Sequence, residues 1–377
     1  MINNNLTRQQ IVFINSILVV WSLGMAWLSL KGGVQHDYKA YITQWQLLLN
    51  GDPPWSTNNA YAPVHVVIGY LLPLHDLAPK FLFVISMLAA NYLLVQDLLT
   101  IRGFDRINLV YLLCIPANIL FIGMGIIYGL NDGFVAALLV FAVLLKLRSH
   151  SKLTGLFIGL AALMKFYPIL LLPFFALDYK KINYEIIISG IVTFVAGFVA
   201  ALIVWGTGPI APVVFNSSRG PSLLSVLLAL RTTFGETGII NFLIQYNTFF
   251  VIAGIIGTFA YIWCKNYSWL EGVVLGYLIL LTIYKVGNQQ FYIPFLFMVA
   301  SLPLLNSNLT DRMAVILIPI VIFLSLFHYG YQFGSDGYRK SLGWVRYYGG
   351  YASFIINILC FATATFHSRI RKHGSQV

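Results

Sequence analysis

The sequence predicts an all-α polytopic membrane protein, for three reasons. Its 377 residues are 59% hydrophobic and only 9% charged, whereas soluble domains carry roughly 25% charged residues. Apolar runs long enough to cross a bilayer recur along the chain. The net charge of +11 lies in short clusters between these runs, as the positive-inside rule predicts. Nucleic acid is therefore not an expected partner. We interpret residues 1–377 as a single transmembrane domain.

The basic clusters fix the order of the spans. The first run, Ile11–Leu30, is too long for a signal-peptide core and is expected to be a retained span. If every basic cluster is cytoplasmic, about twelve crossings follow, with both termini in the cytoplasm. The clusters are Arg102/Arg106, Lys146/Arg148/Lys152, Lys180/Lys181, Lys265, Arg312 and Arg369/Arg371/Lys372. The later spans are Lys80–Ile101, Ile107–Ile127, Asp132–Leu145, a hairpin in Leu153–Lys181, Ile182–Trp205, Asn247–Cys264, Leu270–Tyr284, Phe291–Leu305, Ala314–His328 and Arg346–His367.

Two segments are too short for simple spans. Leu153–Lys181 must hold two short helices, with a break at Met164-Lys165-Phe166-Tyr167-Pro168, where the proline ends or kinks a helix. Val64–Leu77 contains only about 14 residues and is flanked or broken by prolines. It is expected to be interfacial or re-entrant, because a span needs about 20 residues.

Two outer loops, 31–79 and 206–246, carry amphipathic segments. In the first loop, Tyr38–Leu49 predicts a helix that lies in the interface, with Tyr41 and Trp45 covering a cleft. In the second loop, Leu223–Arg231 predicts a similar helix. The outer face is therefore the expected side of the functional site.

Few carboxylates lie on that face. They are Asp37, Asp52, Asp76, Asp132, Glu236 and Asp336. Asp37 directly precedes the amphipathic run and follows His36, which could assist it as a general base; the alternative is a helix N-cap. Asp132 lies in the turn Tyr128–Gly133 and is either a cap or a substrate ligand. Asp52 is explained by turn chemistry.

Cations on the outer face are candidates for a phosphate site. Lys165 lies at the predicted break, Lys285 precedes Val286-Gly287-Asn288, and Arg219, Arg231, Arg339 and Lys340 lie in outer loops. Charges at a membrane edge are costly and tend to be functional, and a lipid phosphate needs such cations. The alternative for the two lysines is snorkelling to the interface.

Several kinds of site are not expected. Cys114, Cys264 and Cys360 lie in apolar runs and predict core packing. The spacing of His36, His65 and His75 matches no usual metal-ligand pattern. A P-loop or dinucleotide fingerprint is absent from the sequence, so a nucleotide-sugar donor is not suggested.

A set of short motifs resembles a known family. These motifs are His36-Asp37 with Tyr41, Leu47–Trp55, Tyr61-Ala62-Pro63, Asn131-Asp132-Gly133, Gly155, Gly159–Ala162, Lys165, Tyr167-Pro168 and Leu172-Pro173. They resemble the GT-C glycosyltransferases, most of all glycosyltransferase family 87, whose members use polyprenol-phosphate-mannose. The first GPI mannosyltransferase has a similar Gly-Leu-Ala…Met-Lys-x-Tyr-Pro run. The second half of the chain matches only in its outer loop and at Asn288–Tyr292, where Gln289 or Gln290 stands in place of a histidine.

The resemblance implies a GT-C fold and an inverting transfer of a sugar from a polyprenyl-phosphate carrier on the extracytoplasmic face of a bacterial-type cell membrane. Asp37 matches the family's base. The residues that it implies for substrate binding are His36, Tyr61, Asn131, Asp132, Lys165, Tyr167, Lys285, Gln289 and Arg219. No metal cofactor is implied, because cationic side chains stabilise the leaving phosphate. The expected partners are membrane lipids, the donor and a glycolipid or glycan acceptor, and a monomer is expected.

The sugar and the class of protein remain open at this stage. Mannose rests on the resemblance alone, and arabinose, glucose or another hexose is an alternative. A transporter or flippase of a lipid-linked saccharide would place charges near the bilayer midplane and show two pseudo-symmetric halves. A non-catalytic assembly subunit would tolerate the loss of Asp37.

Overall fold

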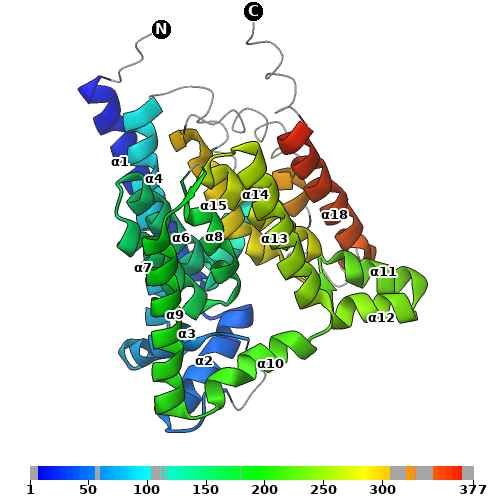
Figure 1. Cartoon of the computed structure of the whole chain (residues 1–377). Coiled ribbons are helices and arrows are strands. Elements are labelled where there is room, and N and C mark those ends of the chain that lie inside the picture. Colours follow the sequence, from blue (N-terminus) through cyan, green and yellow to red (C-terminus); the bar gives the residue numbers. More distant parts are fainter. Residues whose placement is uncertain are drawn as a thin grey trace, which may run out of the picture. The chain divides into compact units, whose positions relative to one another are not determined.

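The structure is a computed structural model that describes residues 7–55, 60–102, 111, 115–116, 118–178, 180–305, 320–325, 327 and 343–366. As predicted, the chain is mainly α-helical (Figure 1). Predicted features outside the described residues are Asp105, Arg106, Cys114, Asp311, Arg312, Asp336, Arg339, Lys340, Arg369, Arg371, Lys372, part of the span 107–127 and most of the span 314–328. The side chains of His36 and Arg102 are likewise not described.

Among the described residues, five helices are long and apolar enough to cross a membrane. They are α1 (Arg8–Gly32), α4 (Ala78–Arg102), α9 (Tyr184–Trp205), α13 (Asn247–Lys265) and α18 (Gly343–Phe366). Large apolar side chains such as Val20, Ile203 and Phe249 are exposed on them. Such exposure suits lipid rather than water. The chain is therefore an integral membrane protein, and the count of about twelve spans stays a prediction.

Contacts within the chain divide it into two compact units. Unit 1 comprises Met1–Asp105 and Phe121–Ser218, and unit 2 comprises Arg106–Leu120 and Arg219–Val377. Each is described by itself below. The interpretation as a single domain stays a prediction.

Unit 1 is built on α4, α6 (Asp132–Leu147), α7 (Ser151–Met164) and α9, which pack in that order. The α7–α9 contact is close because of glycines. A Cβ on Gly155 would lie 2.3 Å from the Ile186 carbonyl oxygen, and one on Gly159 would lie 2.7 Å from the Gly190 carbonyl oxygen. Small residues spaced by four let helix backbones approach in a membrane.

Two breaks in the helices of unit 1 place polar residues. The predicted break is confirmed: α7 ends at Met164, and Lys165 is extended before the 3₁₀ helix η3 (Tyr167–Leu171) and the short α8 (Leu172–Phe175). At the other break, the π-helix η2 (Phe121–Ile127) meets α6 at 101°. Gly129, with φ of +62°, permits this corner, because only glycine adopts such a φ without strain.

The first outer loop forms α2 (His36–Leu49), α3 (Pro63–Ile68) and the 3₁₀ helix η1 (Gly69–Leu74). The helix predicted over Tyr38–Leu49 is confirmed. α3 and η1 have six residues each, so together they reach about 20 Å, which is too short to span the bilayer core. Their position in the interface stays a prediction.

That α2 lies in the membrane interface stays a prediction, but its aromatic rings do not lie on the surface of unit 1. The side chains of Tyr41 and Trp45 are fully buried in unit 1, together with Tyr38. An aromatic ring prefers the interface when its polar tip needs water. Here each tip has a protein partner instead: the Trp45 Nε1–H donates to the His65 carbonyl (2.9 Å), and the Tyr38 hydroxyl donates to the Asp76 carbonyl (2.7 Å).

Short elements complete unit 1. They are the antiparallel pair β1 (Leu177–Asp178) and β2 (Lys181–Ile182), the 3₁₀ helix η4 (Gly208–Ile210) and α10 (Ala211–Ser218).

Unit 2 packs α14 (Trp269–Ile283) against α13, α15 (Tyr292–Ser301) and α18. The second outer loop supplies α11 (Val226–Phe234) and α12 (Gly238–Gln245), so the predicted amphipathic segment is helical from Val226. β3 (Ser222–Leu223) pairs in parallel with β4 (Val286–Gly287). The 3₁₀ helices η5 (Gln289–Phe291) and η6 (Leu302–Leu305) flank α15.

Candidate functional site

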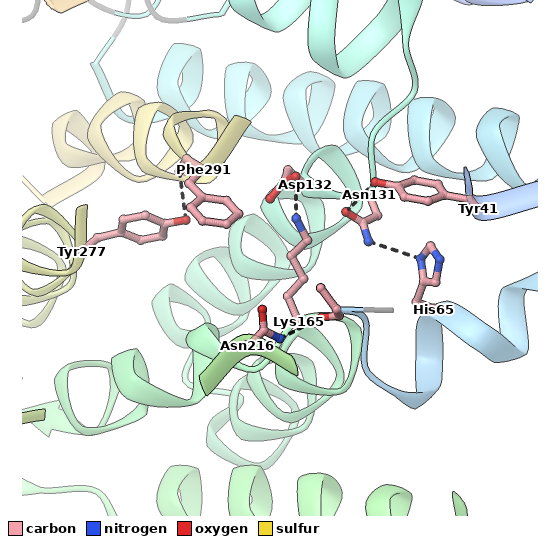
Figure 2. A network of polar contacts seen from close by, with 9 residues as sticks. Tyr41, His65, Asn131, Asp132, Lys165, Asn216, Tyr277 and Phe291 are labelled. Atoms are coloured by element: carbon pink, nitrogen blue, oxygen red, sulfur yellow. Dashed lines mark hydrogen bonds and ion pairs between the residues drawn. The ribbon is translucent and has the colours of Figure 1, made fainter. Parts of the chain in front are cut away.

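A buried ion pair forms where the two breaks of unit 1 meet. The Lys165 ammonium lies 2.7 Å from Asp132 Oδ2 (Figure 2). Asp132 begins α6 after the 101° corner, and Lys165 follows the last residue of α7. The side chains are 0% and 8% exposed. Burying two charges is expensive even when they are paired, and charges at membrane depth are usually functional.

Asn131 connects this ion pair to the first outer loop. Its side-chain Oδ1 accepts from the Tyr41 hydroxyl of α2 (3.3 Å), and its Nδ2 lies 3.2 Å from His65 Nδ1 of α3 (Figure 2). We call Tyr41, His65, Asn131, Asp132 and Lys165 the unit 1 polar cluster. The sequence predicted Asn131, Asp132 and Lys165 as site residues, and the structure brings these three together.

His65 was not among the site residues predicted from the sequence, but it lies in the unit 1 polar cluster. Four aromatic rings surround it: Tyr41, Trp45, Tyr61 and Phe83 have ring centroids 4.7, 5.1, 4.4 and 6.4 Å from its own. Burial, reinforced by the nearby Lys165 charge, holds the pKa of His65 well below its usual value. The imidazole is therefore neutral. Neither the length of the segment Val64–Leu77 nor the spacing of His36, His65 and His75 predicts that His65 lies in this cluster.

Tyr61 covers part of the unit 1 polar cluster. Its ring centroid lies 5.6 Å from the Lys165 ammonium, within the range of a cation–π interaction. Tyr61 is half-buried, whereas the residues of the cluster are buried. Tyr61 was predicted to bind substrate, and its position beside Lys165 and His65 is compatible with that role.

Lys80 forms hydrogen bonds to the chain segments that precede α2 and α6, which contribute residues to the unit 1 polar cluster. Its buried ammonium donates to the carbonyls of Gly33 (2.8 Å) and Ile127 (2.5 Å). Gly33 directly follows α1, and Ile127 is the last residue of η2. Helix C-termini leave carbonyls without intrahelical partners and carry partial negative charge. The backbone N–H of Lys80 also donates to the Tyr38 hydroxyl (3.0 Å). One residue thus fixes the start of α2 relative to the corner before Asp132.

Asp37 lies in the first turn of α2, with its side chain exposed. It acts electrostatically on the cluster. Burial raises the pKa of Tyr41, and the neighbouring Tyr61, Asp37 and Asp132 raise it further. An exposed carboxylate thus lies near buried polar groups of the same unit. Its role as a base stays a prediction.

Three other predicted site residues, Arg219, Lys285 and Gln289, lie in unit 2. The β3–β4 pairing places Ser222 beside Lys285, whose carbonyl accepts from the Ser222 N–H (3.0 Å). Arg219 lies close enough to Tyr284 to interact with it electrostatically. Gln289 is buried, and neither atom of its amide has a hydrogen-bond partner among the described residues. Substrate binding by Arg219, Lys285 and Gln289 stays a prediction.

Two further predictions concern Tyr167 and the binding of metal ions. Tyr167 begins η3 directly after the break and is half-buried. Over the part of the chain that the structure describes, no three His, Cys, Asp or Glu residues come together as a metal site would require. That the protein needs no metal remains a prediction.

The fold and the site define a class of protein, a helical membrane protein with a charged polar cluster at broken helices. A comparison with protein families narrows this class. The model of glycosyltransferase family 87 matches residues 59–212, a range that contains Tyr61, His65, Asn131, Asp132 and Lys165. The match supports a membrane glycosyltransferase. More particularly, it supports glycosyltransferase family 87, which is of the GT-C type, as the family of this chain.

The family match covers part of the chain and part of the predicted site. It confirms the resemblance to family 87 seen in the sequence, and it covers α3 to the first residues of α10, but neither Asp37 nor the unit 2 residues Arg219, Lys285 and Gln289. It does not extend to mannose or to the first GPI mannosyltransferase. A search of curated proteins gave no match.

Proposed function

We propose that the protein is an inverting glycosyltransferase that moves a sugar from a polyprenyl-phosphate carrier to a lipid-linked or glycan acceptor on the extracytoplasmic face. Mannose is the first sugar to test, because of the resemblance described above. The observation that carries the proposal is the exposed Asp37 close to the buried cluster that contains Lys165. This arrangement offers a base and a cation within one unit.

In the proposed reaction, Asp37 removes a proton from the acceptor hydroxyl as the hydroxyl oxygen attacks the anomeric carbon. The bond between this carbon and the phosphate oxygen breaks, and the phosphate leaves with the electron pair. Attack opposite the leaving group inverts the anomeric centre. A well-placed general base contributes roughly 10²–10⁴-fold to the rate.

Lys165 is proposed to stabilise the leaving phosphate. An ammonium can donate three hydrogen bonds, so Lys165 can bridge Asp132 and an entering phosphate oxygen. Electrostatic stabilisation of developing charge is often the largest single contribution to catalysis. Asp132 orients the ammonium and is not proposed as the base, because it is buried and its Oδ2 accepts from Lys165.

The remaining components follow from this chemistry. The cationic side chain replaces a metal ion at the phosphate, so no metal cofactor is proposed. The protein's partners are membrane lipids, the polyprenyl-phosphate donor and a glycolipid or glycan acceptor, with no nucleic acid. The protein is proposed to act as a monomer in a bacterial-type cell membrane.

The test is transfer of radiolabelled mannose from polyprenyl-phosphate-mannose to a membrane lipid extract. Wild type, Asp37→Asn and Asp52→Asn are compared at equal concentrations of folded protein. Asp52 is a matched control, because it is an exposed carboxylate of the same outer loop, beyond the end of α2. We expect Asp37→Asn to reduce transfer by roughly 10²–10⁴-fold and Asp52→Asn to leave it unchanged.

Other outcomes would change the proposal in defined ways. Equal transfer by wild type and Asp37→Asn would keep the enzyme but remove Asp37 as base. If wild type transfers no sugar from mannose, glucose or arabinose donors but moves a lipid-linked saccharide across vesicle membranes, the protein is a transporter.

A further inference from the structure

One ring nitrogen of His65 has no hydrogen-bond partner among the residues that the structure describes. The residue is fully buried, and the described residues offer no partner to its Nε2. Leaving a buried polar group unsatisfied is destabilising, and such groups are rare in folded proteins. His65 Nε2 therefore needs an explanation other than packing.

The contact with Asn131 determines which nitrogen of His65 carries the proton. An amide nitrogen only donates hydrogen bonds, so His65 Nδ1 accepts from Asn131 Nδ2. On the other side of that amide, Oδ1 accepts from the Tyr41 hydroxyl. The proton of the neutral ring therefore lies on Nε2, which is a hydrogen-bond donor without an acceptor.

Asp132 supplies the complementary atom. Its Oδ2 is held by Lys165, but its Oδ1 is buried and has no hydrogen-bond partner in the described part of the chain. The cluster thus leaves one neutral donor and one carboxylate acceptor unused. A hydroxyl group both donates and accepts, so it can satisfy such atoms. Asp132 Oδ1 only accepts hydrogen bonds, so a phosphate oxygen that carries no proton cannot satisfy it.

We propose that His65 and Asp132 recognise hydroxyls of the transferred sugar, with His65 Nε2–H donating to a hydroxyl oxygen and Asp132 Oδ1 accepting from a hydroxyl. This inference rests on the proposed function and concerns the choice of sugar. The phosphate remains on Lys165, beside Asp132. Tyr61 packs on His65 and over Lys165, so the proposal requires its ring to move aside for the sugar.

The test combines variants with altered donors. The purified full-length protein is assayed with polyprenyl-phosphate-mannose and with analogues that lack each sugar hydroxyl in turn. His65→Phe retains an aromatic ring but loses the N–H. We expect its kcat/KM for the mannose donor to fall by about 10- to 100-fold. With the analogue that lacks the contacted hydroxyl, wild type and His65→Phe should be equal.

His75→Phe is the matched control, because His75 is an exposed histidine of the same outer loop. Its kcat/KM should equal that of wild type with every donor. A constant ratio between wild type and His65→Phe across all donors would overturn the recognition of a hydroxyl by His65 and leave the transferase intact. No transfer by wild type from any donor would overturn the proposed function itself, and the inference with it.

A second measurement avoids any dependence on the folding of His65→Phe. In wild-type protein labelled with ¹⁵N-histidine, the proton of His65 should lie on Nε2, and binding of the mannose donor should shift that signal. A Nε2 signal that stays unchanged when the donor is bound would also overturn the inference.

Discussion

Two buried polar clusters, one in each unit, differ in their charge and in how fully their polar atoms are hydrogen-bonded. In unit 2, the Tyr292 hydroxyl of α15 contacts Ser353 Oγ (2.7 Å) and accepts from Asn357 Nδ2 (3.0 Å), both on α18. All three residues are neutral. None of their buried side-chain polar atoms lacks a partner among the described residues. The unit 1 polar cluster contains two charges, and the described part of the chain offers no hydrogen-bond partner to His65 Nε2 or Asp132 Oδ1.

The difference shows what each cluster does for the protein. A closed neutral network fixes two helices against each other and stabilises the fold. A charged cluster with unused donors and acceptors costs folding free energy. Such local conflicts with stability are expected at functional sites. The comparison therefore supports the functional role proposed for the cluster at Asp132 and Lys165 and a structural role for the cluster at Tyr292.

The largest effect on stability is expected when one charge of the unit 1 polar cluster is removed. Asp132→Asn or Lys165→Met alone leaves the other charge buried without compensation, at a cost of about 3–5 kcal/mol in unfolding free energy. The measurement is denaturant unfolding in detergent micelles. The double variant should recover most of this loss. Single variants within about 1 kcal/mol of wild type would show that the pair is not electrostatically coupled.

A somewhat smaller effect is expected at Lys80, which positions both sides of the cluster. Lys80→Met has a side chain of similar length but leaves the Gly33 and Ile127 carbonyls without their donor, at a cost of about 2–4 kcal/mol. The matched control is Lys39→Met, an exposed lysine of α2, which should lie within about 0.5 kcal/mol of wild type. Thermal unfolding of both variants in the same detergent tests this, and equal midpoints would contradict it.

The smallest effect is expected in the closed network of unit 2. Tyr292→Phe removes one hydroxyl, but Ser353 and Asn357 lie on the same helix and can rearrange, so the loss of stability should be about 1 kcal/mol. Sugar transfer should stay at the wild-type rate. A folded Tyr292→Phe protein that transfers sugar more than tenfold more slowly would show that function is not confined to the charged cluster.

Local signals made much of the fold predictable from the sequence. Apolar length and basic clusters indicated the spans, Pro168 marked the break at Lys165, and the amphipathic run Tyr38–Leu49 indicated the helix α2. The environment of the rings of Tyr38, Tyr41 and Trp45 was not predictable. Their polar tips are satisfied by Asp76, Asn131 and the backbone of His65, which are distant in the sequence.

The charged members of the site were predictable from the sequence, but the contacts between its members were not. Asp132 and Lys165 each stood out as a charge near the membrane, yet nothing in their spacing shows that they form an ion pair. His65 lies in an apolar helix, where a histidine is usually a packing residue. Its contact with Asn131, on which the proposed role rests, depends on the corner at Gly129 and is not visible in the sequence.

The most direct test of the account is sugar transfer by the double variant Asp132→Asn/Lys165→Met, measured beside Tyr292→Phe. The double variant removes both charges together, so its folding should be close to that of wild type. If the charged cluster binds the sugar phosphate, the folded double variant transfers sugar at least about 100-fold more slowly than wild type, while Tyr292→Phe transfers normally. A folded double variant that transfers at the wild-type rate would contradict the account.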